Sequence, residues 1–271
     1  MHMKERSTFN VKRLITAVVF IPLFFLYIYY LPPYPYFLGL LLLATVLSMF
    51  EFYTMYKVPK TLYIPALAFG SVLIYNICLY PQWIPETLFA GVTILLVLRL
   101  FTGSSPTDSM KETGPLSMGL LYIAVFISFL WYLRNGALGR EYILLLFASG
   151  WLADSSAYYA GTYLGKRKLC PLVSPNKTYE GAFGSVLGGA AGAVIITSLF
   201  NIPDLSLLKA LLIGAVLGLV TIIGDLIESM FKRDAGVKDS SGIIPGHGGL
   251  LDKIDGFLIS APVLYIILRA F

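Results

Sequence analysis

The sequence predicts an all-α, polytopic membrane protein with about nine transmembrane helices and a cytoplasmic N-terminus. Three observations predict this fold class. The 271 residues have a mean hydropathy of +0.78, and only 13% of them are charged, about half the share found in soluble domains. Apolar runs of about 20 residues, long enough to cross a bilayer, recur along the chain. Lys and Arg gather in alternate connections between these runs.

The apolar runs account for most of the chain. They lie at 14–31, 36–56, 61–80, 84–101, 115–133, 142–162, 180–200, 207–230 and 250–270. The first run follows a basic segment, as in a signal peptide. It is too long for one, and prolines follow it in place of a small-residue cleavage site. The seventh run is rich in Gly and Ala, so we expect Gly184 and Gly188 to permit close helix packing.

The distribution of basic residues predicts the orientation. With a cytoplasmic N-terminus, fifteen Lys and Arg fall on the cytoplasmic side and four on the other. This asymmetry follows the positive-inside rule. The polar segments 163–179 and 231–249 then both face the cytoplasm. We divide the chain into an N-terminal set of five spans, 1–140, and a C-terminal set, 141–271, which carries both polar segments and the expected catalytic site.

The densest group of charges lies between the last two runs, from Asp225 to Asp255. Asp225, Glu228 and Ser229 lie at positions i, i+3 and i+4 and share a helix face, and Asp252 and Asp255 share another. Two such faces joined by a loop can converge on a divalent cation such as Mg²⁺, which prefers oxygen ligands. We therefore predict these four carboxylates as metal ligands. Of the four, Asp225 is the one most strongly indicated as functional, because an unpaired carboxylate in an apolar helix is energetically costly.

Cationic side chains and glycines fill the segment between these carboxylates. Lys232, Arg233 and Lys238 suit a phosphorylated substrate. The glycines around His247, Gly248 among them, let the backbone approach a ligand closely. Taken singly, the charges of this segment also fit a solvated loop, and the histidine also fits a simple turn. Taken together, they indicate an anionic substrate.

A second polar group lies in the sixth run and the segment after it. Asp154 is a carboxylate within an apolar helix, and Lys166, Ser174, Lys177 and Thr178 follow it. Such a segment can bind a triphosphate through its charges, hydroxyls and backbone N–H groups. Topology alone would also place basic residues here, and the Lys-Thr pair also fits a helix cap. The spacing excludes a Walker phosphate loop.

Both polar groups resemble the motifs of one known family. The segment 229–255 reads Ser-Met-Phe-Lys-Arg, four residues, Lys-Asp, five residues, and then Pro-x-His-Gly-Gly-Leu-x-Asp-Lys-Ile-Asp. Upstream are Asp-x-x-Ala-Tyr at 154–158, Gly-Lys at 165–166 and Ser-Pro-x-Lys-Thr-x-Glu-Gly at 174–181. They resemble the phosphatidate cytidylyltransferases (CDP-diacylglycerol synthases) over residues 150–271. Lys253 stands where the family usually has Arg, and Ser156 where Gly is common.

The resemblance implies an integral-membrane nucleotidyltransferase of phospholipid biosynthesis, which converts phosphatidate and CTP to CDP-diacylglycerol and pyrophosphate. The lipid phosphate is already ionised near neutral pH, so we assign no general base. Under this hypothesis Asp225 and Asp252 contact the metal directly, and the catalytic set is completed by Lys232 and Arg233. The substrate-binding set implied by both groups comprises Asp154, Lys166, Ser174, Lys177, Thr178, Glu180, Lys238, His247, Gly248 and Lys253.

The expected cofactor is Mg²⁺. A second, monovalent cation such as K⁺ is compatible with the surplus of carboxylates. The oligomeric state, a homodimer included, stays open, and no nucleic acid is expected. The expected location is the cytoplasmic membrane of a bacterium, with the site facing the cytoplasm, because the chain is compact and shows no transit peptide. A cation-coupled membrane transporter remains the alternative, since intramembrane carboxylates also mark ion pathways. The absence of an internal repeat favours the enzyme.

Overall fold

The computed structural model describes residues 22–103, 105–203, 205–243 and 248–270. Residues 22–30 are helical and precede the labelled elements. The longer helices are α2 (Leu38–Met55), α3 (Lys60–Leu79), α4 (Ile84–Thr102), α5 (Ser109–Met118), α6 (Phe126–Arg134), α7 (Gly139–Tyr163), α8 (Tyr179–Phe200), α9 (Leu207–Asp234) and α10 (Leu251–Ala270). Short π-helical segments lie at Pro33–Phe37 and Gly119–Val125, and short 3₁₀ segments at Pro81–Trp83 and Pro106–Asp108.

Six helical segments are long and apolar enough to cross a membrane, judged by length and composition. They coincide with the second to fifth, seventh and eighth predicted runs. The other two runs within the described residues form α7 and α10, which are 25 and 20 residues long and include several charged residues. Most of the first run lies outside the described residues. The all-α membrane fold is thus confirmed, while the count of nine, the orientation and the division near residue 140 stay predictions.

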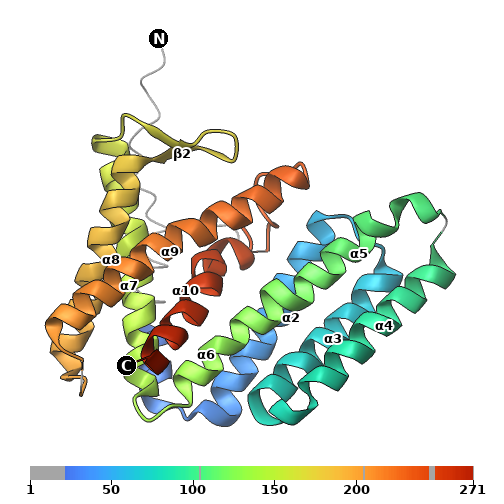
Figure 1. The fold of residues 1–271 in the computed structure, drawn as a ribbon, viewed down its shortest axis with the longest axis horizontal. Helices are drawn as coiled ribbons and strands as arrows, with labels where there is room; N and C mark the ends of the chain where they lie inside the picture. The colour runs from blue at the N-terminus through green and yellow to red at the C-terminus, as the bar shows by residue number, and fades with distance from the viewer. Residues whose placement is uncertain (1–21, 104, 204, 244–247, 271) are drawn as a thin grey trace.

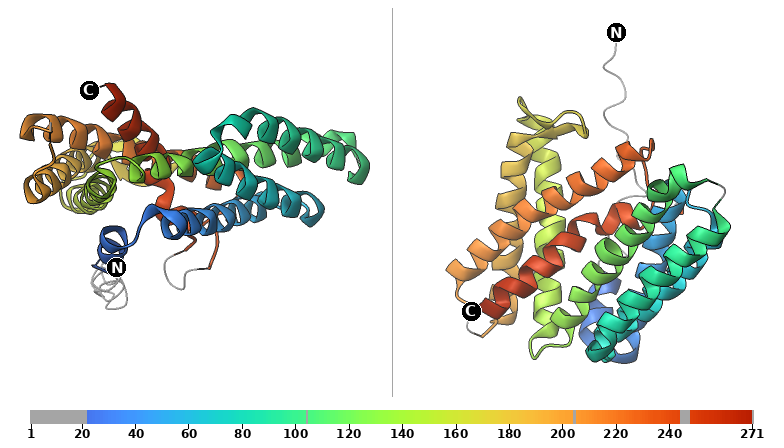
Figure 2. Two further views of the ribbon diagram at one scale, coloured as in Figure 1. Left: turned by 90° about the horizontal axis from the view of Figure 1, so that it is seen from below. Right: turned by 45° about the vertical axis from the view of Figure 1, so that its right-hand side comes forward.

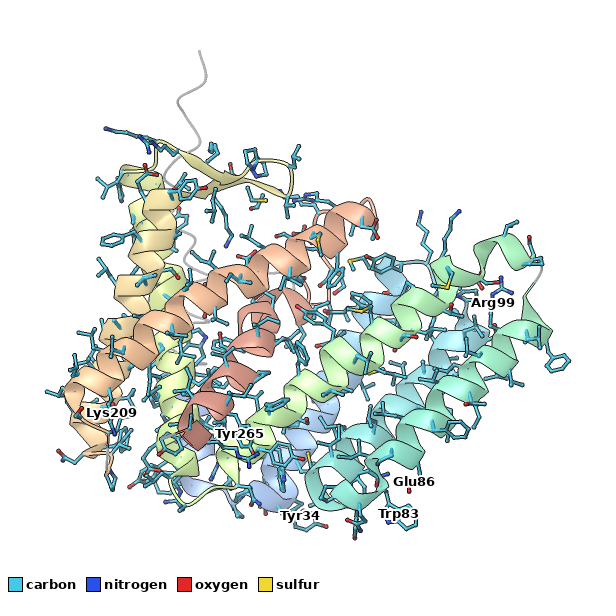
Figure 3. All side chains as sticks on the ribbon, viewed as in Figure 1. Tyr34, Trp83, Glu86, Arg99, Lys209 and Tyr265 are labelled. Atoms are coloured by element: carbon cyan, nitrogen blue, oxygen red, sulfur yellow. The ribbon has the colours of Figure 1, made fainter. Side chains whose placement is uncertain are left out.

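The helices form two groups with α10 between them. Figure 1 shows α2 to α6 on one side and α7 to α9 on the other, and α10 contacts both α6 and α9. Figure 2 shows the same arrangement from two further directions. The hairpin before α8 (residues 168–178), the end of α9 and the α4–α5 connection all lie on the upper side of the molecule in Figure 1, called here the hairpin end. Figure 3 shows Arg99 toward that side and Trp83 and Glu86 at the opposite one.

Glycines let α8 pack directly on its two neighbours. A side-chain carbon at Gly188 would overlap the Leu152 carbonyl oxygen of α7, and one at Gly189 would overlap the Gly214 carbonyl oxygen of α9. At Gly184 the added carbon would lie 2.8 Å from the Ser156 carbonyl oxygen. The predicted close packing through small residues is therefore confirmed. It joins α8 to the second half of α7 and to the first half of α9.

Aromatic contacts connect the two groups of helices. Phe231, near the end of α9, packs edge-on against Phe52 of α2, with ring centroids 5.5 Å apart. The ring of Tyr122, in the π-helical segment between α5 and α6, lies with its centroid 5.4 Å from that of Phe231. Phe257 of α10 stacks on Phe147 of α7 at 4.3 Å. The first two contacts fix the polar end of α9 against the N-terminal helices, and the third joins α10 to α7.

Gly188→Ala is expected to destabilise the protein, with Gly39→Ala as the matched control. Both glycines are helical, but an alanine methyl at Gly39 meets nothing within 4 Å. The alanine at 188 must push α7 away, which costs about 1–3 kcal/mol; at 39 the better helix propensity should be neutral or stabilising. Thermal unfolding in detergent measures the difference. An unfolding temperature for Gly188→Ala at or above that of the wild type would contradict the packing described here.

Candidate active site

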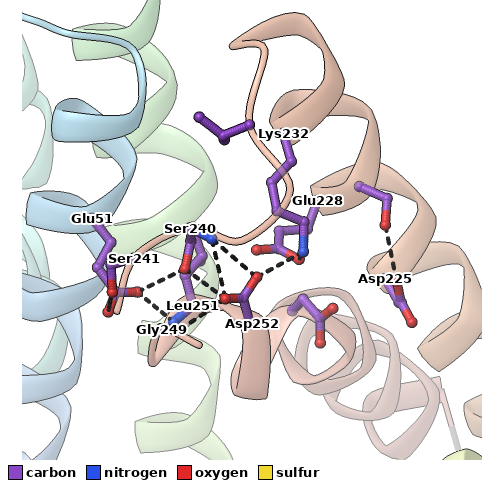
Figure 4. A network of polar contacts seen from close by, with 12 residues as sticks. Glu51, Asp225, Glu228, Lys232, Ser240, Ser241, Gly249, Leu251 and Asp252 are labelled. Carbon is purple, nitrogen blue, oxygen red and sulfur yellow. Dashed lines mark hydrogen bonds and ion pairs between the residues drawn. The ribbon is translucent and has the colours of Figure 1, made fainter. Parts of the chain in front are cut away.

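A buried ion network joins α9 to α10. The Lys232 ammonium group donates to Glu228 Oε2 at 2.5 Å and to Asp252 Oδ1 at 2.7 Å. Glu228 is fully buried and Lys232 is 8% exposed. Glu228 precedes Lys232 by one helical turn, and Asp252 comes from the first turn of α10 (Figure 4). The two predicted carboxylate faces do converge, and Lys232 lies between them.

A second ion pair joins the two polar groups that the sequence separates by about 50 residues. Lys177, on the strand β2 (Ser174–Thr178), pairs with Asp225 Oδ2. Ser229 Oγ, one turn after Asp225, donates to the other carboxylate oxygen at 3.2 Å. The predicted shared face of Asp225 and Ser229 is thus confirmed. The Ser-Pro-Asn-Lys-Thr segment and the end of α9 therefore form one site.

The loop after α9 folds back onto Asp252. Besides Lys232, Asp252 accepts hydrogen bonds from the backbone N–H of Ser240 at 3.1 Å, from its hydroxyl at 3.0 Å and from the Gly249 N–H at 2.8 Å. The Asp252 carboxylate therefore holds the loop at Ser240 and at Gly249, and the ion pair with Lys232 holds Asp252 against α9. Charge-assisted hydrogen bonds of this kind are about twice as strong as neutral ones.

A carboxylate from the N-terminal helices completes this arrangement. Glu51 of α2 is fully buried and accepts hydrogen bonds from the N–H groups of Leu250 and Leu251, both at 2.8 Å. The hydroxyls of Ser241 and Ser240 donate to it at 2.8 and 3.2 Å. Glu51 is not one of the site residues that the sequence motifs predict. The signal was present, because it is a lone acid inside an apolar run.

The polar segment after α7 forms a hairpin rather than an irregular loop. Its strands β1 (Lys168–Cys170) and β2 pair antiparallel. Thr178 Oγ1 is buried and accepts from the Gly181 N–H at 3.1 Å, so it caps α8, as the capping alternative predicted. Glu180 accepts from the backbone N–H of Lys166 at 3.1 Å. Thr178 and Glu180 therefore hold the hairpin, and Lys177 reaches into the site.

The remaining predicted residues differ in their surroundings. Arg233 donates to the carbonyl oxygen of Val173 in the hairpin at 3.2 Å, which ties α9 to it. The side chains of Lys166, Lys238 and Lys253 are exposed, and Ser174 is half-buried. Asp154 is exposed on α7 and interacts electrostatically with Lys177 and Asp225. Gly248 has a φ of +82°, which favours glycine. His247 lies outside the described residues.

A tyrosine ties the end of α2 to the end of α9. Tyr56 follows the last residue of α2 and donates to Asp234 Oδ2 at 2.9 Å. Burial, together with this hydrogen bond and the nearby negative charge, raises the pKa of Tyr56 above its usual value of 10. The hydroxyl therefore stays protonated and keeps donating across the physiological pH range.

The predicted metal ligands are engaged with protein groups. Within the residues described, no three His, Cys, Asp or Glu side chains form a group suited to an ion. Asp255 Oδ1 accepts from the Gly256 N–H at 2.7 Å, and the other three carboxylates contact lysines. One oxygen fits a cation: Glu228 Oε1 is buried and has no hydrogen-bond partner among the described atoms. The oxygen-only donor set suits Mg²⁺, and the metal stays a prediction.

The motifs that meet at this site are shared with known proteins. The model of the cytidylyltransferase family matches residues 11–271. The chain belongs to the cytidylyltransferase family. Among its relatives, a Staphylococcus epidermidis protein is 33% identical, covering 94% of this chain and 96% of the relative. A Bacillus subtilis relative is 35% identical over 83% and 85% of the two chains, and a Thermotoga maritima relative 37% identical over 64% and 66%. All three are named phosphatidate cytidylyltransferase.

These comparisons confirm the resemblance stated from the motifs. They extend it over the N-terminal half, where the sequence analysis found only a set of spans. They give no support to the transporter alternative.

Lys232→Met is expected to destabilise the protein by about 3–5 kcal/mol, because it leaves two buried carboxylates without their cation. Lys60→Met is the matched control, since Lys60 is exposed at the start of α3. Thermal unfolding of both variants in the same detergent compares them. If the two shifts were equal and small, Lys232 would not hold α9 and α10 together.

Proposed function

We propose that the protein is an integral-membrane phosphatidate cytidylyltransferase, which converts phosphatidate and CTP to CDP-diacylglycerol and pyrophosphate. The ion pair between Lys177 and Asp225 carries this proposal, because it unites the two motif groups in one site. The relatives bearing this enzyme's name match almost the whole chain, which supports the same activity.

The chemistry requires several negative charges to be brought together. A non-bridging oxygen of the lipid phosphate attacks the α-phosphorus of CTP, and the bond from that phosphorus to the bridging oxygen of pyrophosphate breaks. The cations at this site lower the repulsion and stabilise charge in the transition state. In this proposal Lys177 and Ser174 bind the nucleotide, while Arg233 and Lys238 bind phosphate. Lys232 holds Glu228 and Asp252 in position at the centre.

Mg²⁺ is the proposed cofactor, with a monovalent cation such as K⁺ beside it. Asp225, Glu228, Asp252 and Asp255 supply the oxygen donors, and the unpartnered Glu228 Oε1 supports this assignment. When bound, the metal would supply positive charge to the substrate phosphates. The negative side chains of this group outnumber the lysines that contact them, which also favours binding of a cation.

The proposed location is the cytoplasmic membrane of a bacterium, with the site at its cytoplasmic face. The excess of Lys and Arg at the hairpin end of the molecule supports this orientation. CTP would then arrive from the cytoplasm, while the lipid would reach the site from within the leaflet.

The activity is tested with purified full-length protein, phosphatidate and radiolabelled CTP, with and without Mg²⁺. We expect CDP-diacylglycerol and pyrophosphate only with Mg²⁺. Asp225→Asn is expected to lower kcat by about 10²–10³-fold, the range for removing one transition-state stabilising group. Glu86→Gln, an exposed acid at the opposite end, is the control. Full activity of Asp225→Asn would show that the reaction does not need the Asp225 carboxylate. The absence of any product from CTP with the wild type would contradict the proposed reaction.

The orientation is tested by cysteine labelling in a Cys170→Ser background, in which the remaining Cys78 is buried. In intact bacterial spheroplasts, a membrane-impermeant maleimide should label Glu86→Cys and should leave Lys238→Cys unlabelled until the membrane is opened. Both side chains are exposed in the structure, so burial does not explain a difference. The reverse pattern would place the site on the outer face.

A further inference from the structure

We propose that Glu51 is a positioning residue for nucleotidyl transfer, which holds the turn at Gly249–Leu251 and thereby Asp252 in the geometry that the reaction needs. This inference rests on the proposed function. It makes the N-terminal helices a working part of the active site, although the motifs lie in the C-terminal half.

The hydrogen bonds of Glu51 support this role. Each carboxylate oxygen accepts two hydrogen bonds: Oε1 from Ser241 Oγ and the Leu250 N–H, and Oε2 from Ser240 Oγ and the Leu251 N–H. All four donors belong to the loop between α9 and α10 or to the first residue of α10. The ion pairs found within the described residues do not include Glu51. A buried carboxylate is tolerated only when it is well hydrogen-bonded, so this loop is the partner that stabilises it.

The start of α10 adds an electrostatic reason. The N–H groups at a helix N-terminus lack partners within the helix and carry partial positive charge. Glu51 contributes a negative charge there from another helix. Glu51 and Asp252 thus hold the same turn from two sides, because Asp252 accepts from Gly249 N–H and Glu51 accepts from the next two N–H groups. Figure 4 shows both carboxylates reaching the turn.

Two small residues show how tightly this contact is built. A side-chain carbon at Gly249 would overlap Ser240 Oγ and lie 2.5 Å from Glu51 Oε2. The single hydroxyl hydrogen of Ser240 is shared between Glu51, at 3.2 Å, and Asp252, at 3.0 Å. A displacement of Glu51 would therefore also displace Asp252, through Ser240 and through the turn at Gly249–Leu251. Since Asp252 also binds Lys232, the shift reaches the centre of the site.

The experiment compares Glu51→Gln and Ser241→Ala with the control Ser48→Ala in the full-length protein. Gln keeps the size of Glu51 but places an N–H₂ group against donors. We expect kcat to fall by about 10–100-fold, the range for residues that orient a catalytic group, with KM for CTP changing less. Ser241→Ala removes one donor to Glu51, so kcat should fall about fivefold, the equivalent of one ordinary hydrogen bond. Ser48 lies buried one turn away, with no hydroxyl partner among the described atoms, and its variant should keep wild-type kcat.

Hydrogen exchange of the peptide containing Leu250 and Leu251 provides a readout independent of activity. Exchange there should accelerate in Glu51→Gln and stay unchanged in Ser48→Ala. In the double variant of Glu51→Gln and Ser241→Ala, the two losses of kcat should be less than multiplicative, because they remove one shared contact.

Several outcomes would overturn the inference. A folded Glu51→Gln protein with wild-type kcat would do so, as would unchanged exchange at Leu250 and Leu251. If Glu51→Gln does not fold, Ser241→Ala decides the matter, and wild-type kcat in that variant rejects the positioning role. If the wild type makes no CDP-lipid, the proposed function fails. If exchange at Leu250 and Leu251 is nevertheless faster in Glu51→Gln, Glu51 still holds the turn, and only its role in nucleotidyl transfer is rejected.

Discussion

The site depends on the lysine that lies between two buried carboxylates. Lys232 contacts Glu228 of its own helix and Asp252 of the next, at 2.5 and 2.7 Å. Isolated charges in a membrane bundle are unfavourable, and they become tolerable when they are paired and hydrogen-bonded. The same pairing fixes the angle between α9 and α10. The interaction that makes the charges tolerable is therefore also the one that positions them for chemistry.

Close packing of small residues brings the second motif group to this centre. Because α8 carries glycines where it meets its neighbours, Gly188 lies directly against Leu152 of α7 and Gly189 against Gly214 of α9. The hairpin before α8 then presents Lys177 to Asp225. Bulky residues at Gly188 or Gly189 would separate the helices and move Lys177 away from its partner. The glycine pattern thus has a functional consequence as well as a structural one.

The N-terminal helices contribute more than membrane anchorage. Phe52 and Tyr122 enclose Phe231 of α9, and Tyr56 donates to Asp234 at the end of the same helix. Glu51 lies on the same helix as Phe52 and Tyr56 and supports the turn before α10. The end of α2 therefore contacts both helices that carry the central charges. These contacts lie within residues 11–271, over which the family model matches.

The sequence by itself determined the membrane class, most helix positions, the shared face of Asp225 and Ser229, and the family. These features depend on local composition, on the period of the helix and on motif order, all of which can be seen in consecutive residues. Only the tertiary structure decided that Lys232 bridges Glu228 and Asp252, that Lys177 reaches Asp225, that β1 and β2 form a hairpin, and that Glu51 belongs to the site. A charge finds its partner according to how distant helices pack, and the small residues and aromatic rings that set this packing act across the whole bundle.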